Sequence, residues 1–118
     1  MAKVMIVDDD QTTTSLLETL LELDGFEVMA VSHGNDVVSK AEQFLPDIFL
    51  MDYHLADTEG VEVLRDIRNH ETLHNIPVVI ASGMDVEDEV MDAGANKFLV
   101  KPFEPGELPT LFNQLING

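Results

Sequence analysis

Five short apolar runs are spaced along the chain, and each predicts a β-strand. Nearly every residue in a run is apolar, without the alternation of polar residues that marks a strand with one face in water. The runs span residues 4–7, 26–31, 48–51, 78–81 and 98–100. Strands of this kind are typical of a parallel sheet that is covered on both faces, so we expect helices on either side.

Between and after the runs, apolar residues recur every three or four positions, which predicts five amphipathic helices. We expect Gly25, Pro46 and Gly94 to end the first, second and fourth helices. The polar positions of the third helix are expected in solvent: Glu62, Arg65, Asp66 and Arg68. The five apolar stripes are Leu16, Leu17, Leu20, Leu21 and Leu23; Val37, Val38, Ala41, Phe44 and Leu45; Val61, Leu64 and Ile67; Val86 and Val90; and Leu108, Leu111, Phe112, Leu115 and Ile116.

The alternation of strand and helix predicts an α/β fold of one domain, residues 1–118. Parallel strands joined by right-handed crossovers form a doubly wound sheet, and we expect the flavodoxin-like strand order 2-1-3-4-5. In that order the first and third strands are neighbours. The acids that follow them, Asp8, Asp9 and Asp52, are therefore predicted to converge at one edge of the sheet.

Charge and composition limit the classes of function that the chain can have. The chain has six Lys and Arg residues against 23 Asp and Glu residues, a formal charge of −17, which repels nucleic acids and anionic membranes. We therefore expect no direct contact with either. The absence of cysteine rules out disulfides and thiolate metal sites and agrees with a cytoplasmic location. The amino-terminal apolar run is too short for a signal peptide or a membrane span.

Polar residues also end the other strands, and together they predict phosphoryl transfer. Three clustered carboxylates need a cation, and hard oxygen ligands favour Mg²⁺ or Mn²⁺ over zinc. Ser82 and Lys101, which end the fourth and fifth strands, offer a hydroxyl and a positive charge to a phosphoryl group. Asp52, at the end of the central strand, is the expected nucleophile.

Four segments give the chain a specific resemblance to the receiver domains of bacterial response regulators, the CheY-like family of two-component signalling. They are VDDD (7–10), MDYHLADTEG (51–60), PVVIAS (77–82) and AGANKFLVKPF (93–103). Each segment is weakly informative alone, but the ordered set is specific and spans nearly the whole chain. The resemblance implies a phosphoacceptor domain that assists its own phosphorylation and dephosphorylation, rather than an enzyme.

The resemblance also implies roles for particular residues. Asp52 would accept phosphate from the phosphohistidine of a sensor histidine kinase or phosphotransfer protein, or from a small phosphodonor. Asp9 and Asp52, with the main-chain carbonyl of His54, would bind Mg²⁺, and Asp8 would assist through water. Lys101 would pair with the phosphate.

Further implied roles concern switching and lifetime. Ser82 would take a phosphoryl oxygen, and Phe98 would change rotamer, altering the face made by the fourth helix, fifth strand and fifth helix. Met84 is expected to shield the phosphoryl group from water. His54 would act there either as a base or as an obstacle.

The implied partners are the kinase and a downstream protein or fused output domain. The protein itself is expected to be a monomer or a weak, phosphorylation-dependent dimer.

Three features depart from the family pattern. Ala56 stands where a proline is common in the phosphorylation loop, which loosens that loop. The segment 82–94 is about one helical turn shorter than usual, and the fourth helix is expected to be short. Phe98 stands where Tyr is commoner, so a hydrogen bond from the ring tip is lost.

Two alternatives compete with the receiver interpretation. Residues 8–12 also fit the D-x-D-x-T nucleophile motif of haloacid-dehalogenase-type phosphatases. That family needs a Lys followed by a second acidic pair, and here the acids 85–88 precede Lys101. We interpret Asp10 instead as a helix N-cap. A receiver-like domain that is never phosphorylated disagrees with the complete set of strand-end residues. The remaining histidines are expected at the surface: His33, His70 and His74.

Overall fold

The computed structural model describes residues 1–118 and contains a five-stranded sheet in the order β2-β1-β3-β4-β5. All neighbouring strands are parallel. The predicted fold and strand order are therefore confirmed. The strands are β1 (Lys3–Val7), β2 (Glu27–Val31), β3 (Ile48–Asp52), β4 (Val78–Ser82) and β5 (Lys97–Val100).

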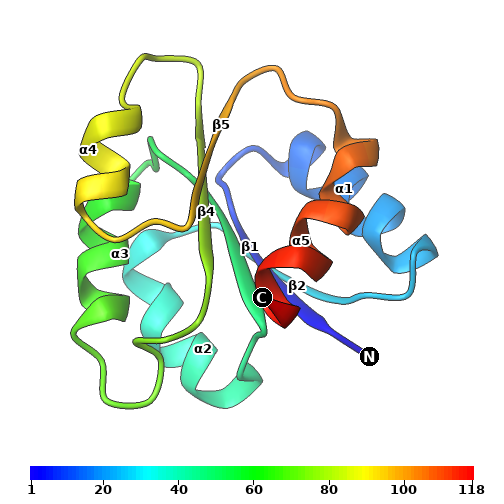
Figure 1. Ribbon diagram of the computed structural model, residues 1–118, viewed down its shortest axis with the longest axis horizontal. Coiled ribbons are helices and arrows are strands. Elements are labelled where there is room, and N and C mark those ends of the chain that lie inside the picture. Colours follow the sequence, from blue (N-terminus) through cyan, green and yellow to red (C-terminus); the bar gives the residue numbers. More distant parts are fainter.

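Helices cover both faces of the sheet, as Figure 1 shows: α1 and α5 lie on one side, and α2, α3 and α4 lie on the other. The helices are α1 (Gln11–Leu23), α2 (Val37–Phe44), α3 (Gly60–Arg68), α4 (Glu87–Asp92) and α5 (Leu108–Asn117). Two short 3₁₀ helices, η1 (Gly34–Asp36) and η2 (Pro105–Glu107), lead into α2 and α5. No helix combines the length and the apolar content needed to cross a membrane.

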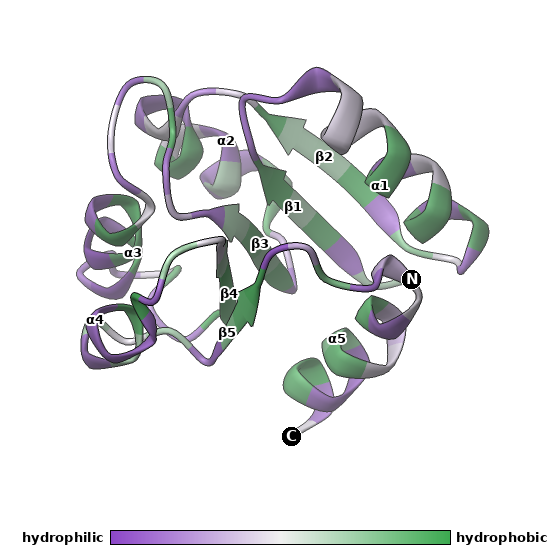
Figure 2. Ribbon diagram, turned by 90° about the horizontal axis from the view of Figure 1, so that it is seen from above, coloured by the Kyte–Doolittle hydropathy of each residue, from purple (hydrophilic) through white to green (hydrophobic).

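The sheet separates two apolar cores, and the strands appear as an apolar layer between the helices in Figure 2. Successive residues of β1 point to opposite faces: Val4 and Ile6 join the core under α1 and α5, whereas Met5 and Val7 join the core under α2, α3 and α4. Burial on both faces explains why the strands are apolar throughout rather than alternating.

Helix ends follow their local sequence signals. The side chain of Asp10 accepts hydrogen bonds from the main-chain N–H groups of Thr12 and Thr13 at 3.1 and 3.4 Å, which confirms that it is the N-cap of α1. Gly25 and Gly94 follow α1 and α4 with φ of +93° and +110°, a conformation that glycine adopts without a steric cost.

Two of the predicted apolar stripes were too broad. Of the five leucines expected to pack on α1, only Leu17 and Leu21 are buried, because one face of the helix meets the sheet. Leu16, Leu20 and Leu23 are exposed. Leu45 is not on the buried face of α2 but caps its end in the left-handed conformation, with φ of 52°.

Arg68 was wrongly predicted to lie in solvent. Its guanidinium is partly buried and donates hydrogen bonds to three main-chain carbonyls and one side-chain amide, and this burial lowers the pKa of Arg68. The acceptors belong to Gly94, His74, Ile76 and Asn96. Arg68 therefore joins the end of α3 to the segments on either side of β4. Helical periodicity could not reveal this role because all four acceptors lie outside the helix.

Candidate functional site

Three aspartates meet at the carboxyl end of the central strands. β1 and β3 are paired with Val7 beside Met51, so the residues that follow, Asp8 and Asp52, emerge side by side. One carboxylate oxygen from each of Asp8, Asp9 and Asp52 lies within 4.8 Å of the others. The predicted convergence of these acids is therefore observed in the structure.

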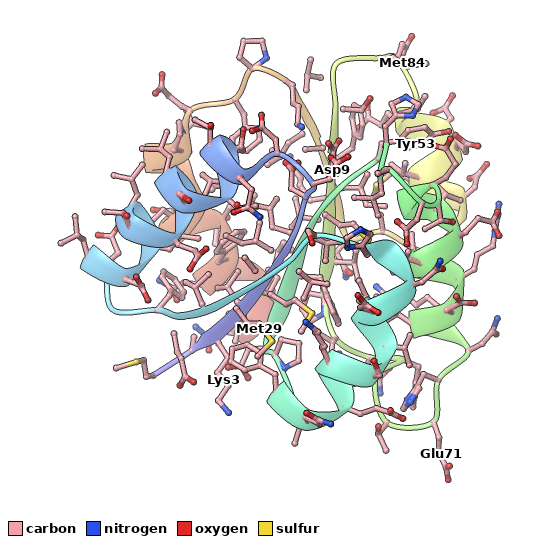
Figure 3. All side chains as sticks on the ribbon, turned by 180° about the vertical axis from the view of Figure 1, so that it is seen from behind. Lys3, Asp9, Met29, Tyr53, Glu71 and Met84 are labelled. Carbon is pink, nitrogen blue, oxygen red and sulfur yellow. The ribbon has the colours of Figure 1, made fainter.

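The cluster lies at one end of the sheet. In Figure 3, Asp9, Tyr53 and Met84 gather at that end, while Lys3 and Glu71 lie at the opposite one. The site is thus built where strands end and loops begin, on a rigid sheet edge.

Asp8 is the most deeply placed acid of the cluster. Its burial raises its pKa above the ordinary value, and the charges of Asp52 and Asp9 act in the same direction. The N–H of Asp10, which donates to Asp8 Oδ1 at 2.9 Å, and the charge of Lys101 both oppose that rise. Burial and mutual repulsion leave the cluster in need of positive charge.

Lys101 is the cation in contact with the cluster. Its Nζ lies 3.2 Å from Asp52 Oδ2 and 3.8 Å from Asp8 Oδ2. The main-chain N–H of Lys101 also donates to the carbonyl of Ser82 at 2.9 Å, which fixes the end of β5 against β4. One ammonium group cannot neutralise three carboxylates. The remaining negative charge and the all-oxygen ligand set suit a divalent Mg²⁺ or Mn²⁺ ion.

Ser82 ends β4 one position beyond the residue that pairs with Asp52. It is buried, and its hydroxyl oxygen accepts a hydrogen bond from the main-chain N–H of Met84 at 3.0 Å. Phe98 is buried in β5, opposite Ile80 of β4. Both residues therefore occupy the strands that border the site on the β5 side.

His54 and Met84 touch each other above the site. The His54 Nε2 atom lies 3.0 Å from Met84 Sδ, and its Nδ1 atom lies 3.2 Å from a carboxylate oxygen of Glu59. The ring of His54 packs edge-on against Tyr53 with 4.7 Å between ring centroids. His54 and Met84 are both exposed. Their mutual contact was not predicted.

Two contacts of the expected phosphorylation loop, residues 52–60, could not be predicted from the sequence. The hydroxyl of Tyr53 donates to the carboxylate of Glu89 in α4, and hydrogen bonding to that carboxylate raises the pKa of Tyr53 to about 12. The carboxylate of Asp57 accepts from the N–H groups of Gly34 and Asn35. Both pairs are far apart in sequence, so no local pattern could indicate them.

The glycine that closes this loop has a steric function. The N–H of Gly60 donates to the carbonyl of Tyr53 at 2.6 Å, and a Cβ at Gly60 would overlap the carbonyl oxygen of Asp52. The loop therefore returns directly over the residue that carries the central carboxylate.

His70 is not a plain surface residue, contrary to the prediction. Only 18% of its side chain is exposed, and its Nε2 lies 2.8 Å from Glu42 at the far side of α2. The Nδ1 atom accepts from the N–H groups of Thr72 and Leu73, so the ring organises the turn after α3. His33 and His74 are exposed as predicted.

Comparisons with known proteins agree on one family. Residues 4–113 match the model of the response regulator receiver domain. The chain is 32% identical over 109 residues to the alkaline phosphatase synthesis transcriptional regulatory protein PhoP of Bacillus subtilis, covering 90% of this chain and 45% of that protein. The chain therefore spans less than half the length of this curated relative.

Solved structures extend the agreement to the fold. A response regulator from Chloroflexus aurantiacus superposes with a TM-score of 0.90 at 29% identity, covering 99% of this chain and 98% of that one. The receiver domain of a sensor histidine kinase from Pseudomonas aeruginosa, described with a magnesium ion in its active-site cleft, gives 0.89 at 28% identity, with the same coverage of 99% and 98%. From its fold, its aspartate cluster and these matches, the chain belongs to the response regulator receiver domain family.

Proposed function

We propose that Asp52 accepts a phosphoryl group and that this event changes the surface presented to a partner. The observation that carries the proposal is the position of the Asp52 carboxylate, which lies 3.2 Å from the Lys101 ammonium and in one cluster with the acids Asp8 and Asp9. This is the arrangement that an in-line phosphoryl transfer requires: an anionic nucleophile with positive charge beside it and a cation site opposite.

Receiver domains act with histidine kinases, so the donor in our proposal is a phosphohistidine of a kinase or phosphotransfer protein, or a small phosphodonor. A carboxylate oxygen of Asp52 forms a bond to phosphorus, and the bond from phosphorus to the histidine nitrogen breaks with its electron pair left on nitrogen. The product is an acyl phosphate on Asp52. Catalysis is mostly positioning and charge stabilisation, because the protein contributes little other covalent chemistry.

Each residue of the site has its own role in this proposal. Asp9 and Asp52, with the main-chain carbonyl of His54, would hold Mg²⁺ or Mn²⁺, and Asp8 would assist through water. When bound, the ion would supply positive charge that offsets the charge of the transferred group. Lys101 neutralises a further phosphoryl oxygen. The Ser82 hydroxyl accepts the Met84 N–H and remains free to donate its proton to a phosphoryl oxygen.

A groove beside the site offers a place for a protein phosphodonor. It has a volume of about 440 Å³ and lies between the first turns of α1 and the segment after β5, lined by residues that include Thr12, Leu16, Phe103 and Pro105. The exposed leucines Leu16 and Leu20 continue its apolar lining along α1. An apolar helix surface of the donor would cover these side chains while its histidine reaches Asp52.

The switching step in this proposal involves β4 and β5. Ser82 moves toward the phosphoryl group, and Phe98 turns into the space that is vacated, which changes the face formed by α4, β5 and α5. Small local shifts become a new binding surface when a packed element has two arrangements. The downstream protein, or an output domain fused to this one, then binds that face.

The hydrogen bonds of Asp10 disfavour the alternative of a haloacid-dehalogenase-type phosphatase. Asp10 is the second aspartate of the D-x-D-x-T motif, and here its carboxylate caps α1, accepting from the N–H groups of Thr12 and Thr13 and from the Thr13 hydroxyl. Membership of the receiver family makes the chain a phosphoacceptor module rather than a turnover enzyme. We propose that residues 1–118 act as one domain, as a monomer or as a weak dimer formed on phosphorylation.

Uptake of phosphate tests the proposal. The protein is incubated with acetyl phosphate and MgCl₂, and its intact mass is followed by mass spectrometry, with a parallel sample containing excess EDTA. We expect one phosphate per chain with Mg²⁺ and far slower uptake with EDTA. No phosphate in either sample, from acetyl phosphate or from a phosphorylated histidine kinase, would contradict the proposal.

A further inference from the structure

The phosphorylation loop is anchored at its far end by a carboxylate outside the aspartate cluster. Asp57 Oδ1 accepts from the N–H of Gly34 and Oδ2 accepts from the N–H of Asn35, both at 2.9 Å. These two N–H groups belong to the first residues of η1, which leads into α2. Each oxygen of the carboxylate thus has its own main-chain donor, and the pair of bonds fixes both the position and the orientation of the side chain.

Side-chain packing makes the same junction tight. A Cβ at Gly34 would overlap the methyl group of Thr58 and would lie 2.9 Å from Val63 Cγ2 and 3.0 Å from Leu55 Cδ1. The loop therefore lies directly on the main chain of Gly34, which only a residue without a side chain permits. The N–H of Leu55 also donates to the carbonyl of Thr58 at 3.1 Å, so the tip of the loop is a closed turn.

The anchored segment is itself tied to the strand end that carries the cation ligands. The N–H of Asp8 donates to the carbonyl of Val31 at 3.1 Å, and Val31 lies three residues before Gly34, where η1 starts. A short path of main chain and hydrogen bonds thus runs from Asp57, through Gly34 and Val31, to Asp8. It joins the loop that carries Asp52 and the His54 carbonyl to the acids at the end of β1.

The hydrogen bonds of Asp57 restrain the loop next to a residue, Ala56, that does little to restrain it. Residue 56 is Ala, whose N–H makes no hydrogen bond within the protein, so neither a proline ring nor a main-chain hydrogen bond from this residue restrains the backbone there. Charge-assisted hydrogen bonds to a carboxylate are stronger than neutral ones and so supply a restraint that alanine does not. The same two bonds hold the pKa of Asp57 below its ordinary value, so the carboxylate stays charged at neutral pH.

We infer that Asp57 is a positioning residue for the phosphoacceptor site, holding the loop so that the His54 carbonyl faces the cation ligands Asp8 and Asp9. The inference rests on the proposed function, because the loop matters only if the site binds a cation and accepts phosphate. Asp57 itself touches neither group. Its effect is expected on the affinity for the metal and on the rate of phosphorylation, through the loop.

Four proteins test the inference. Asp57→Ala removes both bonds, and Asp57→Asn keeps an acceptor for only one. Asp36→Ala removes one negative charge from η1, the segment that Asp57 anchors, and the Asp36 carboxylate makes no capping hydrogen bond. Phe112→Leu lowers stability from the opposite core and leaves the loop untouched. Mg²⁺ affinity is measured from amide chemical shifts in an NMR titration of each protein with MgCl₂, and exchange of the Gly34 and Asn35 amides is measured in the same samples.

Asp57→Ala is expected to weaken Mg²⁺ binding by about tenfold, the size of effect seen when a partner that orients a ligand is lost. Asp57→Asn should lie between it and the parent. Both controls should bind Mg²⁺ like the parent, and the amides of Gly34 and Asn35 should exchange faster only in the Asp57 variants.

Parent-like affinity in Asp57→Ala would overturn the inference, and so would equal weakening in Asp36→Ala, which would make net charge the cause. If Asp57→Ala does not fold, Asp57→Asn carries the test, and unchanged affinity there overturns it. A parent that neither binds Mg²⁺ nor takes phosphate would instead refute the proposed function, so the two failures are distinguishable.

Discussion

At the residue scale, the ammonium group of Lys101 lies 3.2 Å from Asp52 and 3.8 Å from Asp8. Sequence alone indicated Asp8, Asp9, Asp52, Ser82 and Lys101, because each follows the end of a strand and strand ends in a parallel sheet meet at one edge. It could not indicate Asp57, Glu59 or Glu89, since these residues act through side chains that reach across loops. Their partners are Gly34 and Asn35, His54, and Tyr53.

We predict that one residue, Met84, controls the lifetime of the phosphoryl group on Asp52. Met84 is exposed beside the site and is held by His54, and an apolar side chain there cannot orient a water molecule. We expect Met84→Glu to speed autodephosphorylation by up to about 10²-fold, since a positioned carboxylate can act as a base toward water.

The measurement is the rate of phosphate loss after the phosphodonor is removed. Met91→Glu is the matched control, because Met91 is an exposed methionine of the neighbouring helix α4. If Met84→Glu loses phosphate no faster than the parent, shielding by Met84 does not set the lifetime.

Asp57 also predicts a dependence of stability on pH. Hydrogen bonds from Asn35 and Gly34 lower its pKa below the ordinary 3.8 in the folded protein. A lowered pKa stabilises the fold above the unfolded value, and this contribution is lost as the pH falls through the folded value. The stability advantage of the parent over Asp57→Asn should therefore be present at about pH 5 and shrink toward about pH 2.

Urea denaturation of both proteins across this pH range measures the difference. Asp36→Asn serves as the control, because Asp36 makes no capping bond, and it should show no such change relative to the parent. A gap between parent and Asp57→Asn that stays constant with pH would mean that the charge of Asp57 does not strengthen these bonds.

At the scale of elements, the pattern of apolar residues was enough to predict the five strands and five helices. It did not predict how wide the buried face of a helix is. Leu16 and Leu17 fit the same stripe in sequence, but only Leu17 meets the sheet. The reason is that burial depends on where the partner surface lies, and periodicity contains no information about it. The exposed side chain of Leu16 instead lines the groove beside the site.

The helix α4 is short, six residues, in agreement with the short segment 82–94. The Tyr53 hydroxyl donates to Glu89 of α4, so the residue directly after Asp52 contacts an element of the proposed output face. The proposed phosphorylation site thus has a direct structural connection to α4, in addition to the proposed movement of Ser82 and Phe98.

This connection predicts where the structure changes on activation. With beryllofluoride as a mimic of the phosphoryl group, amide exchange should change most in α4, β5 and α5, because the proposed switch alters their packing. Helix α2, which lies away from β5 on the same face as α4, is the internal reference. Changes in α2 equal to those in α4, β5 and α5 would argue against a switch located on this face.

At the scale of the whole molecule, the dominant feature is the charge of −17. Most of the acids lie at the surface, but three converge at one edge of the sheet, where burial raises the pKa of Asp8. The proposed cation site is therefore formed only when the chain is folded. The length of the chain and its alternating pattern predicted the fold class, because right-handed crossovers between parallel strands place helices on both faces of a sheet. The contacts between loops depend on the assembled fold and could not be predicted.

The proposed cation site predicts that Mg²⁺ raises the melting temperature of the protein. A ligand that binds only the folded state at about a hundred times its dissociation constant adds ~2.7 kcal/mol to stability. For a domain of this size the melting temperature should rise by roughly 10 °C. Asp9→Ala should lose most of the rise, and NaCl at equal ionic strength controls for general screening. An equal rise in Asp9→Ala and the parent would remove the metal from this site.

The position of the phosphate is the most direct test of the whole account. The parent, Asp52→Asn and Asp10→Asn are treated with acetyl phosphate and MgCl₂, the acyl phosphate is reduced with borohydride, and the modified residue is located by peptide mass spectrometry. The account predicts modification at Asp52 alone in the parent and in Asp10→Asn, and none in Asp52→Asn. Phosphate gained by Asp52→Asn at the parent's rate, or located on another residue of the parent, would contradict it.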